Sequence, residues 1–207
     1  MLGGCFDAEF STWSNGLIRD CRAGRLAPVL SEVTATEVVE APEAVLVGEL
    51  PELAPALSAA LGHPIAATPP TALRNGPIWL FVRFEREKEV ASLAPDMSAL
   101  ARLSLENRVG GVAAFSFVDT GEFAVHIRCF APAFGVPEDP VTGSANAALP
   151  ACLAHHGMLA RVGRDYLATQ GRELGRDGRV RVRVLDAYGK SEIGGQAVTV
   201  VSGEIRL

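Results

Sequence analysis

The residues of this chain that could do chemistry lie closest together in the stretch 137–146, which reads PEDPVTGSAN. Asp139 lies between two prolines that fix the backbone, so its carboxylate could orient a substrate group or transfer a proton. Thr142 and Ser144 carry hydroxyls, and both are good N-cap residues. A tight turn at Gly143 that leads into a helix would present free N–H groups and a partial positive charge, which favours an anion. The alternative is structural: Asp139 caps the turn, and Thr142 or Ser144 caps the helix.

A strand and a helix must position this stretch. Residues 123–129 alternate apolar side chains with others, and this period of two is typical of a strand. Prolines and a glycine within residues 132–140 predict irregular backbone next. From Ser144 a run of strong helix formers predicts a helix that continues to residue 156, with Gly157 as its C-cap and a kink at Pro150.

Metal and thiol chemistry have weaker signals. His155 and His156 fall at the end of the predicted helix, where positive charge suits the helix dipole, and we prefer that interpretation to a metal site. We expect no metal and no cofactor. The four cysteines are scattered without a C-x-x-C pair, so reduced core thiols are expected at Cys5, Cys21, Cys129 and Cys152.

The remaining pattern predicts an α+β fold, because strands and helices alternate irregularly and the C-terminal hairpins look antiparallel. The expected strands are 5–10, 37–39, 45–47, 78–84, 112–118, 179–184 and 197–201, and the expected helices are 50–61 and 95–105. The strand 179–184 has one apolar face and one face with three arginines, which we interpret as a solvated face rather than a basic binding stripe.

Four blocks of the sequence occur in a characteristic order: residues 128–132 (RCFAP), 135–145 (GVPEDPVTGSA), 170–178 (QGRELGRDG) and 194–200 (GGQAVTV). In this order they resemble the signature of the phenazine-biosynthesis PhzF-like family, with weaker similarity at 76–80 and 95–100. The resemblance implies a diaminopimelate-epimerase-like fold, in which a mixed or antiparallel sheet wraps around a central helix. The helix that begins near Ser144 would be the central helix of the C-terminal lobe.

The resemblance also implies a division of the chain. Residues 1–47 would be a remnant of the N-terminal lobe, residues 48–192 the C-terminal lobe with the EDPVTGS motif, and residues 193–207 C-terminal strands that could return to the N-terminal lobe. That N-terminal lobe looks incomplete, because two family elements have no match in this sequence: the Gly-His-Ala-Thr element, and the Asn-Pro-Ala-Ala block with its neighbouring acid/base glutamate.

The function implied by the resemblance is cofactor-independent isomerisation or epimerisation, by movement of a proton on a small carboxylic acid. Phenazine-pathway members act on a dihydro-hydroxyanthranilate. Asp139 and Ser144 match catalytic residues of the family, and Thr142, Gly143, Ser144 and Ala145 would bind the substrate. Asn146 and the residue after it stand where members commonly show His-Cys, so a thiol-pair epimerase is disfavoured.

A second hypothesis is a non-catalytic protein that binds a small carboxylate. A serine hydrolase is disfavoured, because the sequence contains no Gly-x-Ser-x-Gly elbow. A nucleotide-binding protein is disfavoured as well, because the glycine motifs of such proteins are absent from the sequence. The net charge of -5 argues against nucleic acid as a partner. No apolar run is long enough for a bilayer and the N-terminus does not read as a signal peptide, so we expect a cytoplasmic protein without a membrane partner. Apolar surface exposed by a partial lobe predicts a homodimer.

Overall fold

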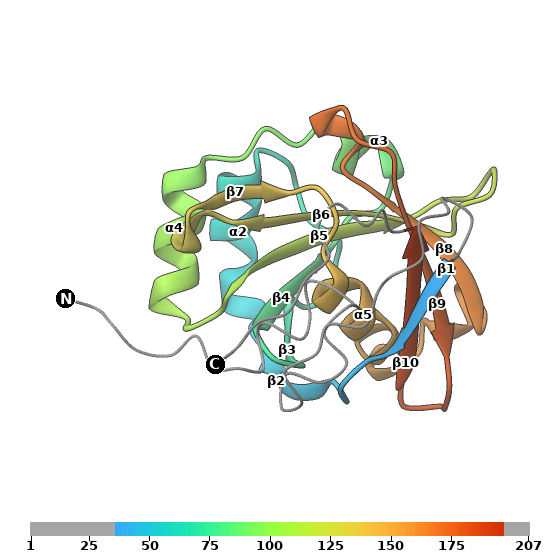
Figure 1. Cartoon of the computed structure of the whole chain (residues 1–207). Helices are drawn as coiled ribbons and strands as arrows, with labels where there is room; N and C mark the ends of the chain where they lie inside the picture. The colour runs from blue at the N-terminus through green and yellow to red at the C-terminus, as the bar shows by residue number, and fades with distance from the viewer. Residues whose placement is uncertain (1–35, 197–207) are drawn as a thin grey trace, which may run out of the picture.

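One ten-stranded sheet runs through residues 36–196, the part of the chain that the computed structural model describes (Figure 1). Its strands are β1 (Thr36–Glu40), β2 (Val45–Glu49), β3 (Thr71–Arg74), β4 (Ile78–Arg83), β5 (Gly111–Phe117), β6 (Val125–Ala131), β7 (Val136–Asp139), β8 (Asp165–Gln170), β9 (Gly178–Val184) and β10 (Ser191–Gln196). The order across the sheet is β1-β10-β9-β8-β6-β5-β4-β3-β2, and β7 pairs with β6. Strand β4 is parallel to β5 and β6 is parallel to β8, whereas the other described pairs are antiparallel.

Helices lie on both faces of this curved sheet. The longest described helix, α5 (Gly143–His155), lies inside the curve and contacts β2, β3 and β4 on one side and β9 and β10 on the other (Figure 1). The helices that pack on the outer face of β4 to β6 are α2 (Ala54–Leu61), α3 (Glu87–Ala91) and α4 (Met97–Glu106). Short 3-10 turns are η1 (Pro51–Leu53), η2 (Pro132–Phe134), η3 (Leu159–Arg161) and η4 (Arg172–Leu174).

Helix α5 is the core of the fold. Every residue from Ser144 to Leu153 is buried, and the helix is rich in alanine and leucine on all sides. A helix that is apolar all round must be enclosed by other elements, and here the sheet encloses it. This confirms the expected α+β fold with a mixed sheet wrapped around a central helix. The helix continues through Pro150, and Gly157 follows it with φ +68°, as expected of a C-terminal glycine.

Strand β6 is buried on both faces, which the alternating pattern did not indicate. Val125, Ile127 and Cys129 pack toward α5 in the inner core. His126 and Arg128 point to the outer face, where α3 and α4 cover them, so both side chains are buried as well. In β6, polar side chains on one face therefore do not indicate that this face is exposed to solvent.

Two other expectations changed. The proline-containing stretch 132–140 is not wholly irregular, because Val136–Asp139 forms the short strand β7. Proline is tolerated there because β7 lies off the main path of the sheet and pairs with β6 at two positions separated by a bulge. The predicted helix 50–61 is divided into η1 and α2, and Gly62 ends it in the left-handed region.

The arginine face of β9 is confirmed as solvated. Buried and exposed residues alternate strictly along this strand. The three exposed arginines form ion pairs with acidic neighbours, namely Arg179 with Asp177 and Glu122, Arg181 with Asp165, and Arg183 with Glu192. The expected strands 5–10 and 197–201 lie outside the described residues. Between residues 36 and 196, every helix is too short or too polar to cross a membrane.

Candidate active site

The turn before α5 brings the five predicted site residues together. Asp139 ends β7, and Gly143 begins α5 three residues after Pro140. Thr142 occupies the N-cap position with extended backbone angles, φ −109° and ψ 97°. Ser144 lies one residue inside the helix, so the expectation that it could be the N-cap is wrong.

Asp139 is oriented by the hydroxyl of Thr142. This hydroxyl donates a hydrogen bond to Asp139 Oδ2 at 2.8 Å and accepts one from Gln170 Nε2 at 2.9 Å. Thr142 is at the N-cap position, but its hydroxyl oxygen accepts no hydrogen bond from the backbone N–H groups of the helix. Its side chain instead holds a half-buried carboxylate beside the helix start.

Gln170 fixes the turn from the end of β8. Its side chain is fully buried and its Nε2 also donates to the Asp139 carbonyl oxygen at 2.8 Å. Its Oε1 accepts from Thr142 N at 3.0 Å and from Asn146 Nδ2 at 2.9 Å. All four hydrogen-bonding positions of the amide are used, so its orientation is determined by the network. The sequence indicated this residue only as part of a family block.

Gly171 allows β8 to pass close behind the turn. Its φ is +82°, and a Cβ at this position would lie 2.5 Å from the carbonyl oxygen of Pro140. Only glycine combines this backbone angle with this close approach. In the sequence, the glycine that directly follows the polar Gln170 is the signal that could have identified the network.

Ser144 is held by a residue of β4 and by one in the turn between β3 and β4. Trp79 Nε1, in β4, donates to Ser144 Oγ at 2.9 Å, and Asn75 Nδ2 donates to the Ser144 carbonyl oxygen at 2.9 Å. Because an indole nitrogen can only donate, it occupies a lone pair of the hydroxyl and leaves the hydroxyl proton available. Ser144 is thus arranged as a hydrogen-bond donor rather than as a nucleophile activated by a base.

The first turn of α5 offers unpaired N–H groups. The first hydrogen bond inside the helix runs from Asn146 N to the Thr142 carbonyl at 3.1 Å. Within residues 36–196 no acceptor bonds to the N–H groups of Gly143, Ser144 and Ala145. Together with the positive end of the helix dipole, these groups form a site that suits a carboxylate.

A buried ion pair holds the strand that carries Asp139. The guanidinium of Arg128 bonds to both carboxylate oxygens of Glu138, through Nε and Nη2, at 2.8 Å each. Its Nη1 donates to the carbonyl oxygens of Val90 and Leu93 at 3.1 and 2.9 Å. Because neighbouring residues in a strand face opposite sides, this anchor on Glu138 leaves Asp139 facing α5.

Thiol chemistry has no support at this site. Cys129 lies opposite Asp139 in the β6–β7 pairing and is fully buried, and burial raises the pKa of its thiol far above the ordinary value. Ala147 stands where family members commonly have the cysteine, so that position carries no sulfur. The side chain of Asn146 before it bonds to Gln170 and to the Thr142 carbonyl. Cys129 is therefore a core residue, as expected.

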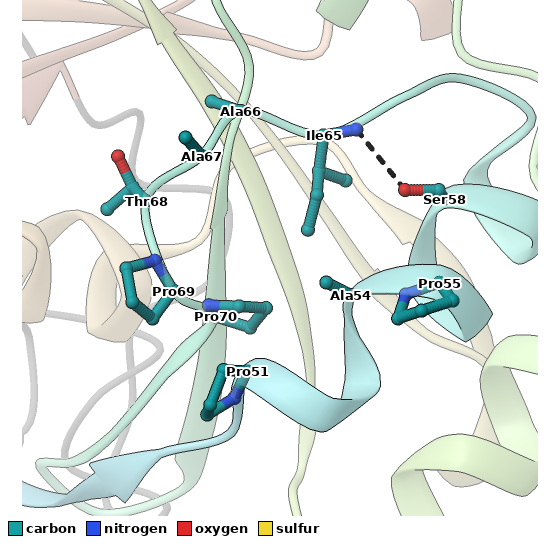
Figure 2. A pocket seen from close by; sticks show the side chains of 10 residues that line it. All are labelled: Pro51, Ala54, Pro55, Ser58, Ile65, Ala66, Ala67, Thr68, Pro69 and Pro70. Carbon is teal, nitrogen blue, oxygen red and sulfur yellow. Dashed lines mark hydrogen bonds between the residues drawn. The ribbon is translucent and has the colours of Figure 1, made fainter.

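A hollow lies away from this turn. A depression of about 400 Å³ is lined by η1, α2 and the loop before β3, shown in Figure 2. Its lining contains no titratable side chain and none of the predicted site residues; the one hydrogen bond drawn there joins Ile65 N to Ser58 Oγ at 3.3 Å. It offers no groups for proton transfer.

Comparison with known proteins places the chain in a family. Residues 30–203 match the phenazine biosynthesis-like protein family, PhzC-PhzF. The chain is 32% identical over 145 residues to an "Uncharacterized isomerase YddE" of Salmonella typhimurium, covering 68% of this chain and 48% of that protein. It is 34% identical over 145 residues to the trans-2,3-dihydro-3-hydroxyanthranilate isomerase of Pseudomonas aeruginosa, covering 70% and 47%.

The fold agrees with this match. A crystal structure of a phenazine biosynthesis protein of the PhzF family from Enterococcus faecalis is similar with a TM-score of 0.61 and 28% identity, covering 85% of this chain and 60% of that one. The chain spans about half the length of the curated relatives it matches. Because the family match extends over most of the sequence and the fold agrees, the chain belongs to the phenazine biosynthesis-like (PhzC-PhzF) family.

Proposed function

We propose that this chain holds a small carboxylic acid at the start of α5 and takes part in a cofactor-independent isomerisation in which a proton moves on that acid. The observation that carries the proposal is the pair of prepared groups at the helix start. The Asp139 carboxylate is oriented by Thr142 and Gln170. The Ser144 hydroxyl is oriented by Trp79. The names of the relatives, which are isomerases, support the reaction class.

Each predicted residue has a role in this proposal. The N–H groups of Gly143, Ser144 and Ala145 bind the substrate carboxylate at the positive end of the helix. The Ser144 hydroxyl donates a further hydrogen bond to the same anion. Asp139 accepts a hydrogen bond from a polar substrate group and assists proton transfer, while Thr142 keeps its carboxylate in place.

The reaction also needs an acid/base group that moves the proton at the substrate carbon atom. Among residues 36–196, neither a histidine nor a glutamate side chain hydrogen-bonds to Asp139 or Ser144. We propose that the acid/base glutamate acts from outside these residues. The alternative function is a non-catalytic protein that binds a small carboxylate, and it is favoured by the same observation that, among residues 36–196, no histidine or glutamate side chain hydrogen-bonds to Asp139 or Ser144.

One experiment separates the two functions. The chain is incubated in D₂O with trans-2,3-dihydro-3-hydroxyanthranilate, and deuterium incorporation is followed by NMR while binding is measured by calorimetry. Exchange that Asp139→Asn abolishes and the exposed control Asp119→Asn retains would support the isomerase. Binding without exchange, weakened by about 1–3 kcal/mol in Asp139→Ala, would support the binding protein. Neither binding nor exchange would contradict both.

The proposal extends to assembly and location. Residues 1–47 and 193–207 are proposed to belong to a shared second lobe, and the pairing of β1 with β10 supports this. We propose a homodimer, supported by the exposed apolar side chains of the edge strands β1 and β2, which are Val38, Val39, Val45, Leu46 and Val47. A stable monomer in light scattering at micromolar concentration would contradict it. A cytoplasmic location is proposed from composition and is tested by cell fractionation.

A further inference from the structure

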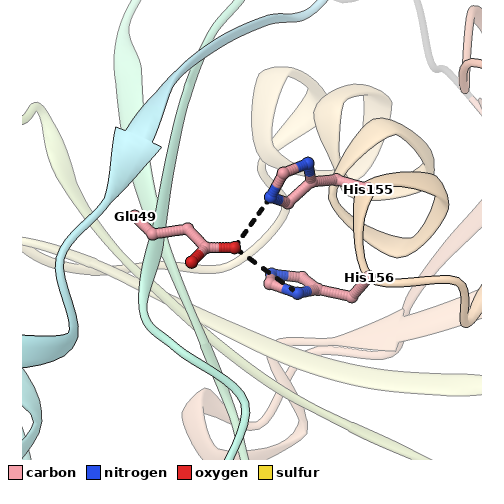
Figure 3. A group of neighbouring side chains, drawn as sticks. All are labelled: Glu49, His155 and His156. Atoms are coloured by element: carbon pink, nitrogen blue, oxygen red, sulfur yellow. Dashed lines mark hydrogen bonds and ion pairs between the residues drawn. The ribbon is translucent and has the colours of Figure 1, made fainter.

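Three side chains that could bind a metal ion meet at the other end of α5. Glu49 is the last residue of β2, His155 is the last residue of α5, and His156 is its C-cap. One ligand atom from each lies within 4.8 Å of the others. Figure 3 shows the Glu49 carboxylate pointing between the two imidazole rings, with Glu49 Oε1 2.8 Å from His155 Nε2 and 4.0 Å from His156 Nδ1.

The hydrogen bonds of Thr71 fix which nitrogen of His156 is free. The Thr71 hydroxyl donates its only proton to the Pro69 carbonyl oxygen at 2.9 Å. It also lies 2.7 Å from His156 Nε2, so at this contact it must accept a proton from that nitrogen. A neutral His156 then carries a lone pair on Nδ1, the nitrogen that faces Glu49. Metal-binding histidines typically have their second nitrogen held in this way.

Without a cation, this arrangement sets two acceptors against each other. The Nδ1 lone pair of His156 and the Glu49 carboxylate are 4.0 Å apart and point into the same space. A hydrogen bond between Glu49 and His155 satisfies one oxygen but leaves His156 Nδ1 facing a negative charge. A cation between the three groups would turn this repulsion into attraction.

The spacing fits a tetrahedral ion. Bonds of about 2.0–2.1 Å to nitrogen and oxygen in a tetrahedral site place the ligand atoms about 3.3 Å from one another. The observed separations extend from 2.8 Å to at most 4.8 Å, so small rotations of the side chains would reach this geometry. The side chains of Glu49 and His155 are 40% and 34% exposed, which leaves room for water as a fourth ligand.

The backbone adds a favourable field. The last carbonyl groups of α5 form the negative end of its dipole, and a divalent cation is stabilised there. The sequence indicated only that two histidines suit this end. It did not indicate the carboxylate, which comes from a residue 106 positions earlier in the chain.

We propose that Glu49, His155 and His156 bind one divalent transition-metal ion of the Zn²⁺ class. Imidazole and carboxylate are ligands that Zn²⁺ accepts. The ion would tie the edge strand β2 to the C-terminal end of the central helix. At 1.5 Å per residue over α5 it lies about 18 Å from the candidate active site, so the proposal is independent of the proposed function.

The test is Zn²⁺ binding by the untagged full chain, measured by calorimetry and by the thermal unfolding midpoint. We expect one ion per chain and, at a hundredfold excess over the dissociation constant, a midpoint raised by roughly 5–10 °C. Glu49→Gln and His155→Gln should each weaken binding at least about tenfold. Glu52→Gln, which changes an exposed carboxylate outside the cluster, should bind as the wild type does.

Two further measurements keep the proposal open to refutation. Thr71→Val keeps all three ligands but removes the acceptor that orients His156, so it should weaken binding about tenfold. Co²⁺ in the site should show d–d absorption without thiolate charge-transfer bands, because no ligand is a cysteine. Absence of saturable binding at micromolar Zn²⁺, affinity unchanged in Glu49→Gln and His155→Gln, or thiolate bands with Co²⁺ would each overturn the proposal.

Discussion

The buried ion pair beside the turn gives a prediction that can be worked out from the structure. Glu138→Gln removes the negative charge opposite Arg128 and leaves the shape of the side chain almost unchanged. The side chain of Arg128 is only 6% exposed, and that of Glu138 only 8%. Water therefore cannot replace the lost carboxylate, and we expect a large loss of stability.

The surroundings set the size of the loss. Removing one partner of a buried pair costs about 3–5 kcal/mol. Arg128 keeps its hydrogen bonds to the carbonyls of Val90 and Leu93, and Glu173 Oε2 lies 3.9 Å from its Nε. These remaining partners place the expected value at the lower end, about 3 kcal/mol. With a typical dependence on denaturant, the urea midpoint should fall by about 1–2 M.

A second ion pair serves as the control because it differs in burial. Arg181 Nε and Nη2 bond to the two oxygens of Asp165 at 2.8 and 2.6 Å, a fork like that of Arg128 on Glu138. Its side chains are 51% and 42% exposed. Urea unfolding of Asp165→Asn should therefore show a much smaller loss than Glu138→Gln, since water solvates the group that remains. Equal shifts of the two midpoints would refute the argument that burial gives the pair its strength.

Three further predictions concern other parts of the fold. In urea unfolding, Gly171→Ala should lower the stability of the protein far more than Gly163→Ala does. Both glycines have positive φ, but of the two only Gly171 would bring the new Cβ to 2.5 Å from a backbone oxygen. Equal losses of stability in the two variants would contradict this. Burial raises the pKa of Cys152 to about 12 and that of Cys129 further, so peptide mapping should find both alkylated by iodoacetamide only after denaturation. Burial lowers the pKa of His126 below 6.5 in the folded protein, so the unfolded state binds the proton more readily. The free energy of unfolding should therefore fall as the pH drops through 6.5. The urea midpoint of His126→Gln should change less over this pH range.

The sequence predicted the elements around the site because their signals are local. The strand before the turn, the helix after it and the glycine that ends the helix follow from periodicity, helix propensity and backbone angles over a few neighbouring residues. Thr142 was one of two N-cap candidates found in the same way, the other being Ser144, and the structure places Thr142 there. The use of the Thr142 hydroxyl was not predicted, because that depends on Gln170, which lies 28 residues further along the chain.

The hydrogen-bond partners of Ser144 also lie far away in the sequence, so local patterns could not predict them. Trp79 and Asn75 reach it from 65 and 69 residues away, across a sheet whose strand order the sequence pattern did not reveal. The burial of His126 and Arg128 was also not predicted. Alternation along a strand indicates which side chains share a face, but only the packing of α3 and α4 shows that the second face is covered.

The burial of the start of α5 supports the proposal that a carboxylate binds there. A helix start at a protein surface satisfies its free N–H groups with water, but here Ser144 and Ala145 are 9% and 0% exposed. Side chains from other strands satisfy the neighbouring groups, yet within residues 36–196 the first three N–H groups of the helix bond to no acceptor. Buried donors without partners are costly, and Ser144 and Ala145 place two buried residues with such donors at one point. The carboxylate that we propose to bind there would supply the missing acceptors, so the burial of the helix start supports the proposed anion site.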